Sequence, residues 1–355
     1  MNGQNLMIKQ TIILVGSNSV HTLRYLVGIS PFVNNIVFIT NNINGLELPN
    51  NVVAHEVNFS LYNLRARFQI AKIISNYEGN IIHIQQANSY AYHTLKAIKG
   101  KNFKTILTTW GSDILVLPKH GRIFANMVKF NLANSDIITS DSLYMSSKIK
   151  ELCPKVKELH TINFGIQNIP ANTTDLSVKE NIILSNRLHK PLYNIDKIIL
   201  AFAKVITNHP EYKLVIAASG TETMLLKELS RNLGLNDNQI IFTGMLSYNE
   251  LVSWYQRAKY FISIPISDST SSSLLEAIAY GCYPILSNLP ANIEWVMDDT
   301  NGIINQNLDN LDMDIIKAIN LSDNNLTKSM NFNYNLIKQK AVFSNNIQKF
   351  INLYT

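Results

Sequence analysis

The feature that most constrains the fold is an alternation of β-branched segments with amphipathic segments, which runs along the first half of the chain and then restarts. The first half predicts strands over 11–15, 36–40, 80–84, 105–109 and 137–140. The second half predicts strands over 182–185, 212–217, 239–243, 260–264 and 283–286. Helical segments between the strands are typical of a parallel sheet covered on both faces. The sequence therefore predicts an α/β protein with two doubly wound, Rossmann-like lobes that face each other across a cleft.

Length and one polar segment divide the chain into these two lobes. The chain has 355 residues, which is more than a single hydrophobic core usually supports. A stretch rich in Asn, Pro and Thr begins near Gly165 and has the composition of an interdomain linker. We therefore expect a first lobe over 1–168, a linker over 169–180, a second lobe over 181–330, and C-terminal helices over 331–355 that return to the first lobe.

The apolar runs and the cysteines exclude several other classes of protein. The longest apolar stretches, such as 260–266, have the length of a strand, whereas a helix that crosses a bilayer needs about 20 apolar residues. The early run 11–16 is too short for the core of a signal peptide, so we expect a cytoplasmic protein. Cys153 and Cys282 lie far apart and outside any Cys/His cluster, which argues against a disulfide framework and a structural zinc site.

Positive charge is concentrated in the first half of the chain. Residues 1–165 contain 16 Lys and Arg against 8 Asp and Glu, a local net charge of +8 in a chain of net charge +6. Such a surface suits an anionic partner, and we expect peripheral binding to an anionic membrane surface. A solvated face is the alternative, and no nucleic acid is expected because the chain lacks a recognised nucleic-acid-binding motif. The basic residues concerned are Arg65, Arg67, Lys72, Lys96, Lys99, Lys101 and Lys104.

The most informative segment is 267–285, which follows a predicted strand and turns into a helix. The first turn of a helix offers unpaired backbone N–H groups, and these favour an anion such as a diphosphate. Asp268 stands before this helix and Glu276 within it. A carboxylate repels phosphate but accepts paired hydrogen bonds from vicinal sugar hydroxyls, so a ribose is the expected ligand beside the diphosphate. The small hydroxyl residues of the turn are Thr270, Ser271, Ser272 and Ser273.

This segment resembles that of the family-4 retaining glycosyltransferases of the GT-B fold, of bacterial polysaccharide type. Those enzymes carry two acidic residues separated by seven others, followed by a run of Ala, Gly and Pro. Here Glu276 is followed by Ala277, Ala279, Gly281 and Pro284, and Asp268 stands in place of the usual first Glu. The resemblance also covers Arg187 after the strand 182–185, Gly244 after the strand 239–243, and the segment 109–113 in the first lobe.

The resemblance implies a retaining glycosyltransferase that moves a sugar from a nucleotide diphosphate, with UDP expected, to a lipid-linked or saccharide acceptor. The expected setting is the synthesis of O-antigen, capsule or another cell-surface glycan, with no cofactor and no catalytic metal. The first lobe would bind the acceptor and the second lobe the nucleotide sugar. Another GT-B enzyme, such as a nucleotide-sugar epimerase or a phosphorylase, or a non-catalytic sugar-binding relative, is the alternative.

Site residues follow from the same resemblance. Glu276 would bind the donor ribose, Asp268 the transferred sugar and Arg187 the diphosphate, and these three are the expected catalytic residues. The expected donor-binding residues are Gly16, Arg187, Lys190, Gly244, Thr270, Ser271, Ser272, Ser273 and Glu276. The expected acceptor-binding residues are Trp110, Asp113 and His83. The family usually has a Lys where this chain has Leu192 or Tyr193, so Lys190 or Lys197 is the candidate for a second cation.

Several of these residues also have a purely structural interpretation. Ser273 and Glu276 have the spacing of a capping box, in which the glutamate only satisfies the start of a helix. Asp113 could cap the turn that follows it. His83, on an apolar strand, could be a core residue, and His189 is expected to be exposed to solvent.

Overall fold

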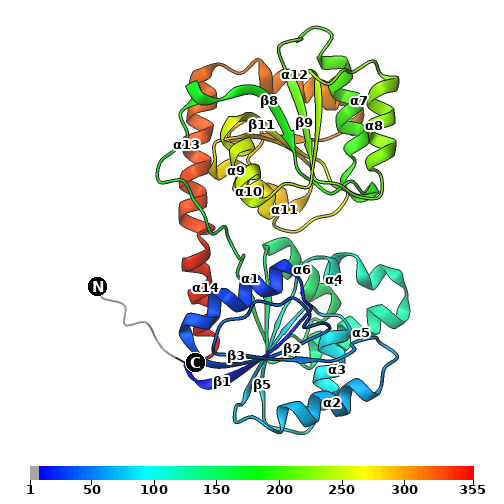
Figure 1. Cartoon of the computed structure of the whole chain (residues 1–355), viewed down its shortest axis with the longest axis vertical. Coiled ribbons are helices and arrows are strands. Elements are labelled where there is room, and N and C mark those ends of the chain that lie inside the picture. The colour runs from blue at the N-terminus through cyan, green and yellow to red at the C-terminus, as the bar shows by residue number, and fades with distance from the viewer. Residues whose placement is uncertain (1–7) are drawn as a thin grey trace. The chain divides into compact units, whose positions relative to one another are not determined.

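The computed structural model describes residues 8–355, which form two compact units (Figure 1). Unit 1 comprises residues 8–164 together with Ser344–Thr355, and unit 2 comprises Gly165–Phe343. Each unit contains one parallel sheet with helices on both faces. The predicted α/β fold with two Rossmann-like units is confirmed.

Unit 1 is built around a parallel sheet of seven described strands, in the order β3-β2-β1-β4-β5-β6-β7. The order reverses between β1 and β4, and in open sheets of this kind ligands bind beyond the carboxyl ends of the strands near such a switch point. The strands are β1 (Ile8–Val15), β2 (Val33–Thr40), β3 (Val52–Glu56), β4 (Ile81–Gln85), β5 (Lys104–Thr108), β6 (Ile137–Ser140) and β7 (Glu158–Thr161).

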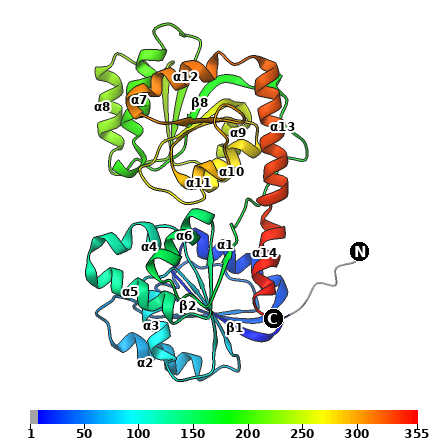
Figure 2. The same cartoon turned by 180° about the vertical axis from the view of Figure 1, so that it is seen from behind.

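Two groups of helices cover the faces of the unit 1 sheet (Figure 2). On one face the strand residues Ile13 and Val15 share a hydrophobic core with Ile70 and Leu95. The helices on this face are α2 (Arg65–Ile74), α3 (Ser89–Ala97), α4 (Ser112–Leu115), α5 (Arg122–Ala133) and α6 (Leu143–Leu152). The other face is covered by α1 (Val20–Ile29) and by α14 (Phe343–Asn352) from the end of the chain.

Unit 2 contains a parallel sheet of six described strands, in the order β10-β9-β8-β11-β12-β13. The order reverses between β8 and β11, so the carboxyl ends of these two strands form the switch point of unit 2. The strands are β8 (Glu180–Ser185), β9 (Lys213–Ala217), β10 (Ile240–Gly244), β11 (Ala258–Ser263), β12 (Tyr283–Ser287) and β13 (Ile303–Asn305).

The helices of unit 2 also divide between the two faces of its sheet (Figure 2). One hydrophobic core joins the sheet to α7 (Ile195–Val205), α8 (Thr223–Asn232) and α12 (Leu311–Ile319). A second core joins the opposite face to α9 (Tyr248–Arg257), α10 (Ser272–Ala279) and α13 (Asp323–Lys340). The short helix α11 (Pro290–Ile293) follows β12. Within residues 8–355 no helix is long and apolar enough to cross a membrane.

Candidate functional site

The candidate donor site is formed where two neighbouring strands of unit 2 end. β8 ends at Ser185 and is followed by Asn186 and Arg187, and β11 ends at Ser263 and leads into the loop that contains Asp268. Because β8 and β11 pair in parallel, both loops leave the same edge of the sheet, at its switch point. The sequence therefore brings Arg187 and Asp268 together although they are 81 residues apart.

Arg187 is buried and is held in place by three side chains. Its exposed fraction is 8%. One terminal nitrogen donates to Oδ2 of Asp268 at 2.7 Å, and the other donates to the hydroxyl of Ser271. The guanidinium carbon lies 4.5 Å from the centre of the Tyr193 ring. A buried charge is stable only when it is paired and hydrogen-bonded, and these contacts meet that requirement.

The electrostatic environment keeps this guanidinium charged. Burial alone would lower the pKa of Arg187, but the carboxylate of Asp268 and the hydroxyl of Tyr193 outweigh it and raise that pKa above its usual value. Arginine has five N–H donors, and the contacts with Asp268 and Ser271 occupy two of them. The site therefore presents a fixed positive charge with donor capacity beyond its internal contacts.

The start of helix α10 adds backbone donors to this charge. Ser271 is the N-cap, and its hydroxyl accepts a hydrogen bond from the N–H of Leu274. Ser272 and Ser273 form the first turn, where N–H groups have no carbonyl partner within the helix. The same Ser271 hydroxyl also accepts from Arg187, so the cation is tied directly to the helix start. Thr270 and Ser273 are half-buried at this position.

Glu276 lies one turn further into α10, and the capping-box interpretation of this residue is wrong. The N-cap is Ser271 rather than Ser273, so Glu276 stands beyond the position from which a glutamate reaches back to the N-cap. Its Oε2 instead accepts a hydrogen bond from the hydroxyl of Tyr255 at 3.3 Å. The Tyr255 hydroxyl in turn accepts from Nδ2 of Asn186 at 2.6 Å.

This chain of hydrogen bonds joins Glu276 to the residue beside Arg187. Burial and the neighbouring Glu276 raise the pKa of Tyr255 well above its usual value, so its hydroxyl stays protonated and donates to the carboxylate. Oδ1 of Asn186 is buried and has no hydrogen-bond partner among the described residues. Sequence reasoning missed Asn186 and Tyr255, because only the fold brings α9 next to the end of β8.

A buried lysine supports the helices behind this site. Nζ of Lys179 donates to the carbonyl oxygens of Tyr255, Ala258 and Tyr280 at 2.8, 2.9 and 2.7 Å. These carbonyls lie at the C-terminal ends of α9 and α10, where a cation stabilises the exposed ends of the helix dipoles. Burial lowers the pKa of Lys179. Nothing in the sequence around Lys179 indicated this role.

The other donor-site candidates lie in different surroundings. Lys190 is exposed, and Lys197 is half exposed, with Asp196 at 3.9 Å. Tyr193, at one of the two positions where the resemblance led us to expect Lys, covers the guanidinium of Arg187 instead. Gly244 ends β10 with a φ of +71°, a conformation that favours glycine, and a Cβ there would have no atom within 4 Å.

The expectation for His189 is wrong. Its side chain is fully buried rather than exposed, and Nδ1 lies 2.8 Å from the hydroxyl of Thr223. Burial lowers the pKa of His189, so the ring is neutral. The Cβ of a larger residue at Gly220 would fall 2.4 Å from the carbonyl oxygen of His189, so the loop after β9 packs tightly against this residue.

Two of the expected acceptor residues lie at the carboxyl edge of the unit 1 sheet. The ring of Trp110 stacks on Phe164 at 4.3 Å, and its Nε1 donates to Oε1 of Gln85 at 2.9 Å. Asp113 is buried and accepts hydrogen bonds from the backbone N–H groups of Ala87 at 2.6 Å and Trp110 at 3.0 Å. Burial raises the pKa of Asp113, and these bonds oppose the rise. Asp113 thus fixes the loop on which Trp110 stands.

His83 and Gly16 lie in unit 1, where His83 is hydrogen-bonded in the core and Gly16 is closely packed. Nδ1 of the fully buried His83 lies 3.0 Å from the hydroxyl of Tyr25 and 2.8 Å from that of Tyr354, and Nε2 lies 2.6 Å from Thr108. Burial lowers its pKa to about 3, so the ring is neutral. A Cβ at Gly16 would lie 2.9 Å from the side chain of Thr22, which explains a glycine at this strand end. Gly16 belongs to unit 1, whereas Arg187 and Glu276 belong to unit 2.

Two family models match successive parts of the chain. The model of the glycosyl transferases group 1 matches residues 171–338, which include Arg187, Asp268 and Glu276. The model of the glycosyl transferase 4-like proteins matches residues 11–142. The chain is a family-4-like glycosyltransferase of the GT-B type. No group of three or more His, Cys, Asp or Glu side chains in the described part of this glycosyltransferase could hold a metal ion.

Curated relatives of the glycosyltransferase share parts of its length. N-acetyl-alpha-D-glucosaminyl L-malate synthase of Bacillus anthracis is 24% identical over 250 residues, which cover 65% of this chain and 64% of that protein. Alpha-monoglucosyldiacylglycerol synthase of Streptococcus pneumoniae is 29% identical over 168 residues, which cover 44% and 38%. The matches thus span less than two thirds of the length of each of these relatives.

Solved structures share the fold of this glycosyltransferase over almost all of its length. HepE of Anabaena, in complex with UDP and glucose, superposes with a TM-score of 0.76 at 13% sequence identity. The superposition covers 97% of this chain and 99% of that chain. At this identity the comparison supports the GT-B fold of the chain.

Proposed function

We propose that unit 2 binds a nucleoside-diphosphate sugar, with UDP as the nucleotide, and that the enzyme transfers a hexosyl group from it. The observation that carries this proposal is the buried Arg187, tied by Ser271 to the start of α10 and paired with Asp268. A fixed cation beside unpaired backbone N–H groups is suited to a diphosphate. The solved structure of HepE with UDP and glucose supports the choice of UDP.

In the proposed mechanism, Arg187 and the first turn of α10 stabilise the diphosphate as it leaves the sugar. Negative charge grows on the leaving group in the transition state, and donors that are already oriented lower the barrier without reorganisation. The contacts with Asp268, Ser271 and Tyr193 orient the guanidinium in advance. These groups would supply the positive field that stabilises the leaving diphosphate.

Glu276 would hold the donor ribose through its two carboxylate oxygens. The hydroxyl of Tyr255 donates to Oε2 and would hold the carboxylate in place. Asp268 would contact the transferred sugar once the diphosphate takes up donors of Arg187. Retention of the anomeric configuration is proposed from the family resemblance, since the described residues of the site do not by themselves define a nucleophile.

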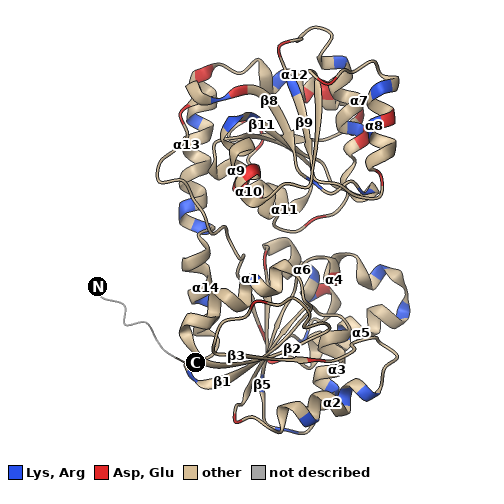
Figure 3. Ribbon diagram, viewed as in Figure 1, with Lys and Arg blue, Asp and Glu red and all other residues tan. Residues whose placement is uncertain are grey.

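We propose a lipid-linked or saccharide acceptor in cell-surface glycan synthesis, reached at an anionic membrane surface. The relative from Streptococcus pneumoniae, an alpha-monoglucosyldiacylglycerol synthase by name, supports a lipid acceptor. In unit 1, helix α2 carries basic residues (Figure 3) and also exposes Phe68 to 77%. Tyr62 and Leu64, just before α2, are 82% and 59% exposed. Exposed apolar side chains beside cations are typical of surfaces that bind at a bilayer interface.

Liposome sedimentation tests this membrane surface. Binding to vesicles should rise with the fraction of anionic lipid and fall with salt. The variant Lys99→Glu/Lys101→Glu in unit 1 should bind less, whereas the charge-matched variant Lys213→Glu/Lys328→Glu in unit 2 should bind as the wild type does. Equal loss in both variants would mean that only the net charge of the protein matters, and absence of wild-type binding at low salt would refute the proposal.

A thermal-shift screen of nucleotides tests the donor proposal. A ligand at 100 times its dissociation constant stabilises the folded state by about 2.7 kcal/mol, so UDP or a UDP-sugar should raise the melting temperature measurably. The shift should vanish in Arg187→Met, whose melting temperature without ligand is measured in parallel. If GDP or another nucleotide gives the shift, the base is different. If no nucleoside diphosphate stabilises the protein, the donor site is wrong.

A further inference from the structure

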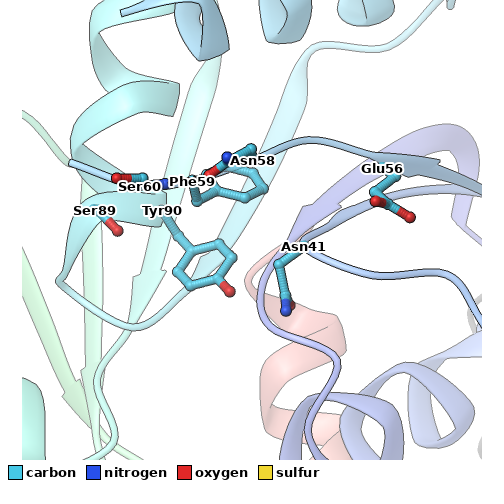
Figure 4. Close-up of a pocket in the computed structure, with 7 residues that line it drawn as sticks. All are labelled: Asn41, Glu56, Asn58, Phe59, Ser60, Ser89 and Tyr90. Atoms are coloured by element: carbon cyan, nitrogen blue, oxygen red, sulfur yellow. Dashed lines mark hydrogen bonds between the residues drawn. The ribbon is translucent and has the colours of Figure 1, made fainter. Parts of the chain in front are cut away.

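A pocket lies in unit 1, at the carboxyl edge of its sheet and apart from the residues discussed so far. Its volume is about 490 Å³, within the range of about 300–1,000 Å³ that is usual for small-molecule sites. It is formed where β2 and β3 end and where α3 begins (Figure 4). None of the expected acceptor residues, Trp110, Asp113 and His83, lines it. The lining includes Asn41, Glu56, Asn58, Phe59, Ser89 and Tyr90.

The charge of this pocket differs from that of the unit around it. Unit 1 has a large excess of basic residues, yet the pocket contains no Lys or Arg and one carboxylate, that of Glu56. A phosphate bound here would face this carboxylate without a cation to offset the repulsion. The pocket is therefore unsuited to a diphosphate, a lipid phosphate or a nucleic acid backbone, and it suits an uncharged polar ligand.

The hydrogen-bonding groups of the pocket are oriented by their neighbours. Oδ1 of Asn41 accepts from the N–H of Asn18 at 2.8 Å, and Oδ1 of Asn58 accepts from the N–H of Ser60 at 2.9 Å. Each amide is therefore turned so that its Nδ2 is the available donor, and neither Nδ2 has a partner among residues 8–355. Oε2 of Glu56 accepts from the N–H of Ile43 at 3.3 Å, which leaves the carboxylate with further acceptor capacity.

An aromatic wall completes the pocket. The buried ring of Phe59 packs against the ring of Tyr90 with centroids 4.3 Å apart, so the position of Tyr90 is fixed from behind. In Figure 4 the hydroxyl end of Tyr90 points toward Asn41. Burial raises the pKa of Tyr90 to about 12, so the hydroxyl remains protonated at neutral pH. The pocket thus combines a rigid apolar surface with donors and a carboxylate acceptor.

We propose that this pocket binds a neutral saccharide unit of the acceptor, with the sugar ring against Tyr90 and its hydroxyls bonded to Glu56, Asn41 and Asn58. A sugar has apolar C–H faces for the aromatic ring and vicinal hydroxyls for a carboxylate, and the pocket offers both kinds of contact. That the bound saccharide belongs to the acceptor rests on the proposed glycosyl transfer, but saccharide binding in this pocket can be measured without a donor.

The test is saturation-transfer difference NMR with the full chain and no nucleotide. The probes are the methyl glycosides of glucose, galactose, mannose and N-acetylglucosamine. Inorganic phosphate is tested separately, and its binding is detected by the broadening of its phosphorus resonance. At least one glycoside should receive saturation from the wild type. Tyr90→Leu, which removes the aromatic face, and Glu56→Gln, which removes the charge, should each weaken that binding by about fivefold or more. Phe332→Leu alters an exposed aromatic side chain of unit 2, outside the pocket, and should bind as the wild type does.

The possible results separate the pocket from the donor site. The proposal is overturned if no glycoside binds, if Tyr90→Leu and Glu56→Gln bind as tightly as the wild type, or if the pocket variants abolish phosphate binding instead. Melting temperatures show whether each variant is folded, and Tyr90→Phe provides a milder change at the same position. UDP stabilisation depends on residues of unit 2, so its absence would refute the donor proposal without altering the glycoside result.

Discussion

Replacing Glu276 with Gln should weaken UDP binding strongly while the protein stays folded. The structure allows this change because Ser271, not Glu276, caps α10, and because the Gln carbonyl can still accept from Tyr255. The effect on the free energy of unfolding should therefore remain below about 1 kcal/mol.

The expected loss of affinity follows from the hydrogen bonds that the carboxylate would make. Two vicinal ribose hydroxyls would donate to its two oxygens, and a hydrogen bond to a charged group contributes about 1.5–3 kcal/mol. Gln keeps one acceptor oxygen and loses both the second acceptor and the charge. We expect UDP affinity to fall by about 10-fold to 150-fold in isothermal titration calorimetry.

Glu250 provides a matched control in the same unit. It forms a true capping box with Ser247 at the start of α9, with bonds of 2.8 and 2.7 Å from the Ser247 N–H and hydroxyl to its carboxylate. Glu250→Gln should lower the melting temperature slightly and leave UDP affinity unchanged. If Glu276→Gln behaves in the same way, the carboxylate of Glu276 has only a structural role and the ribose contact is refuted.

Further predictions concern single residues and the metal dependence of the enzyme. Asp268→Asn should lower turnover more than UDP affinity, if its carboxylate stabilises charge on the transferred sugar; equal loss in both would indicate simple binding. Transfer activity should persist in excess EDTA, because Arg187 and the start of α10 supply the positive field, and a rate that fell with chelator and returned with manganese would contradict this. The pKa of His83 is about 3 in the folded protein and about 6.5 when unfolded, so the unfolded chain binds more protons. The free energy of unfolding should therefore decrease by about 1.4 kcal/mol per pH unit as the pH falls from 6.5 toward 3. Urea unfolding measured at several pH values should show a weaker dependence of this free energy on pH in His83→Gln. Lys179→Met removes the charged donor from three buried carbonyl oxygens, which keep only the neutral donors Cys282 and Thr174, and it should cost about 3 kcal/mol in the same unfolding assay. An unchanged midpoint would show that the ammonium does not contribute to stability.

Much of the fold could be predicted from the sequence because the strands are strongly patterned. The central strands β1 and β11 each contain a buried apolar run, IILV in β1 and YFI in β11, and these strands were the easiest to predict. The edge strand β3 was not predicted. It is only partly buried, and its sequence VVAHE has neither a long apolar run nor a clear alternation. The short strand β13, with three residues, gives too little signal for the same kind of inference.

Apart from Arg187, which the family resemblance indicated, the candidate site could be predicted only where residues lie close in the sequence. The segment that contains Asp268, Ser271 and Glu276 is continuous, so its spacing was informative. The contacts that orient it come from elsewhere: Lys179 and Tyr255 reach the site through the packing of α9 and α10 on the sheet. The pocket around Tyr90 likewise could not be predicted from the sequence, because β2, β3 and α3 contribute to it from distant parts of the chain.

A crystal structure of the protein with UDP tests the central claim most directly. The account predicts that the diphosphate lies within hydrogen-bond distance of the Arg187 guanidinium and of the N–H groups of Ser272 and Ser273, with the ribose hydroxyls on Glu276. A nucleotide bound away from the start of α10, or bound there with its ribose turned away from Glu276, would contradict it.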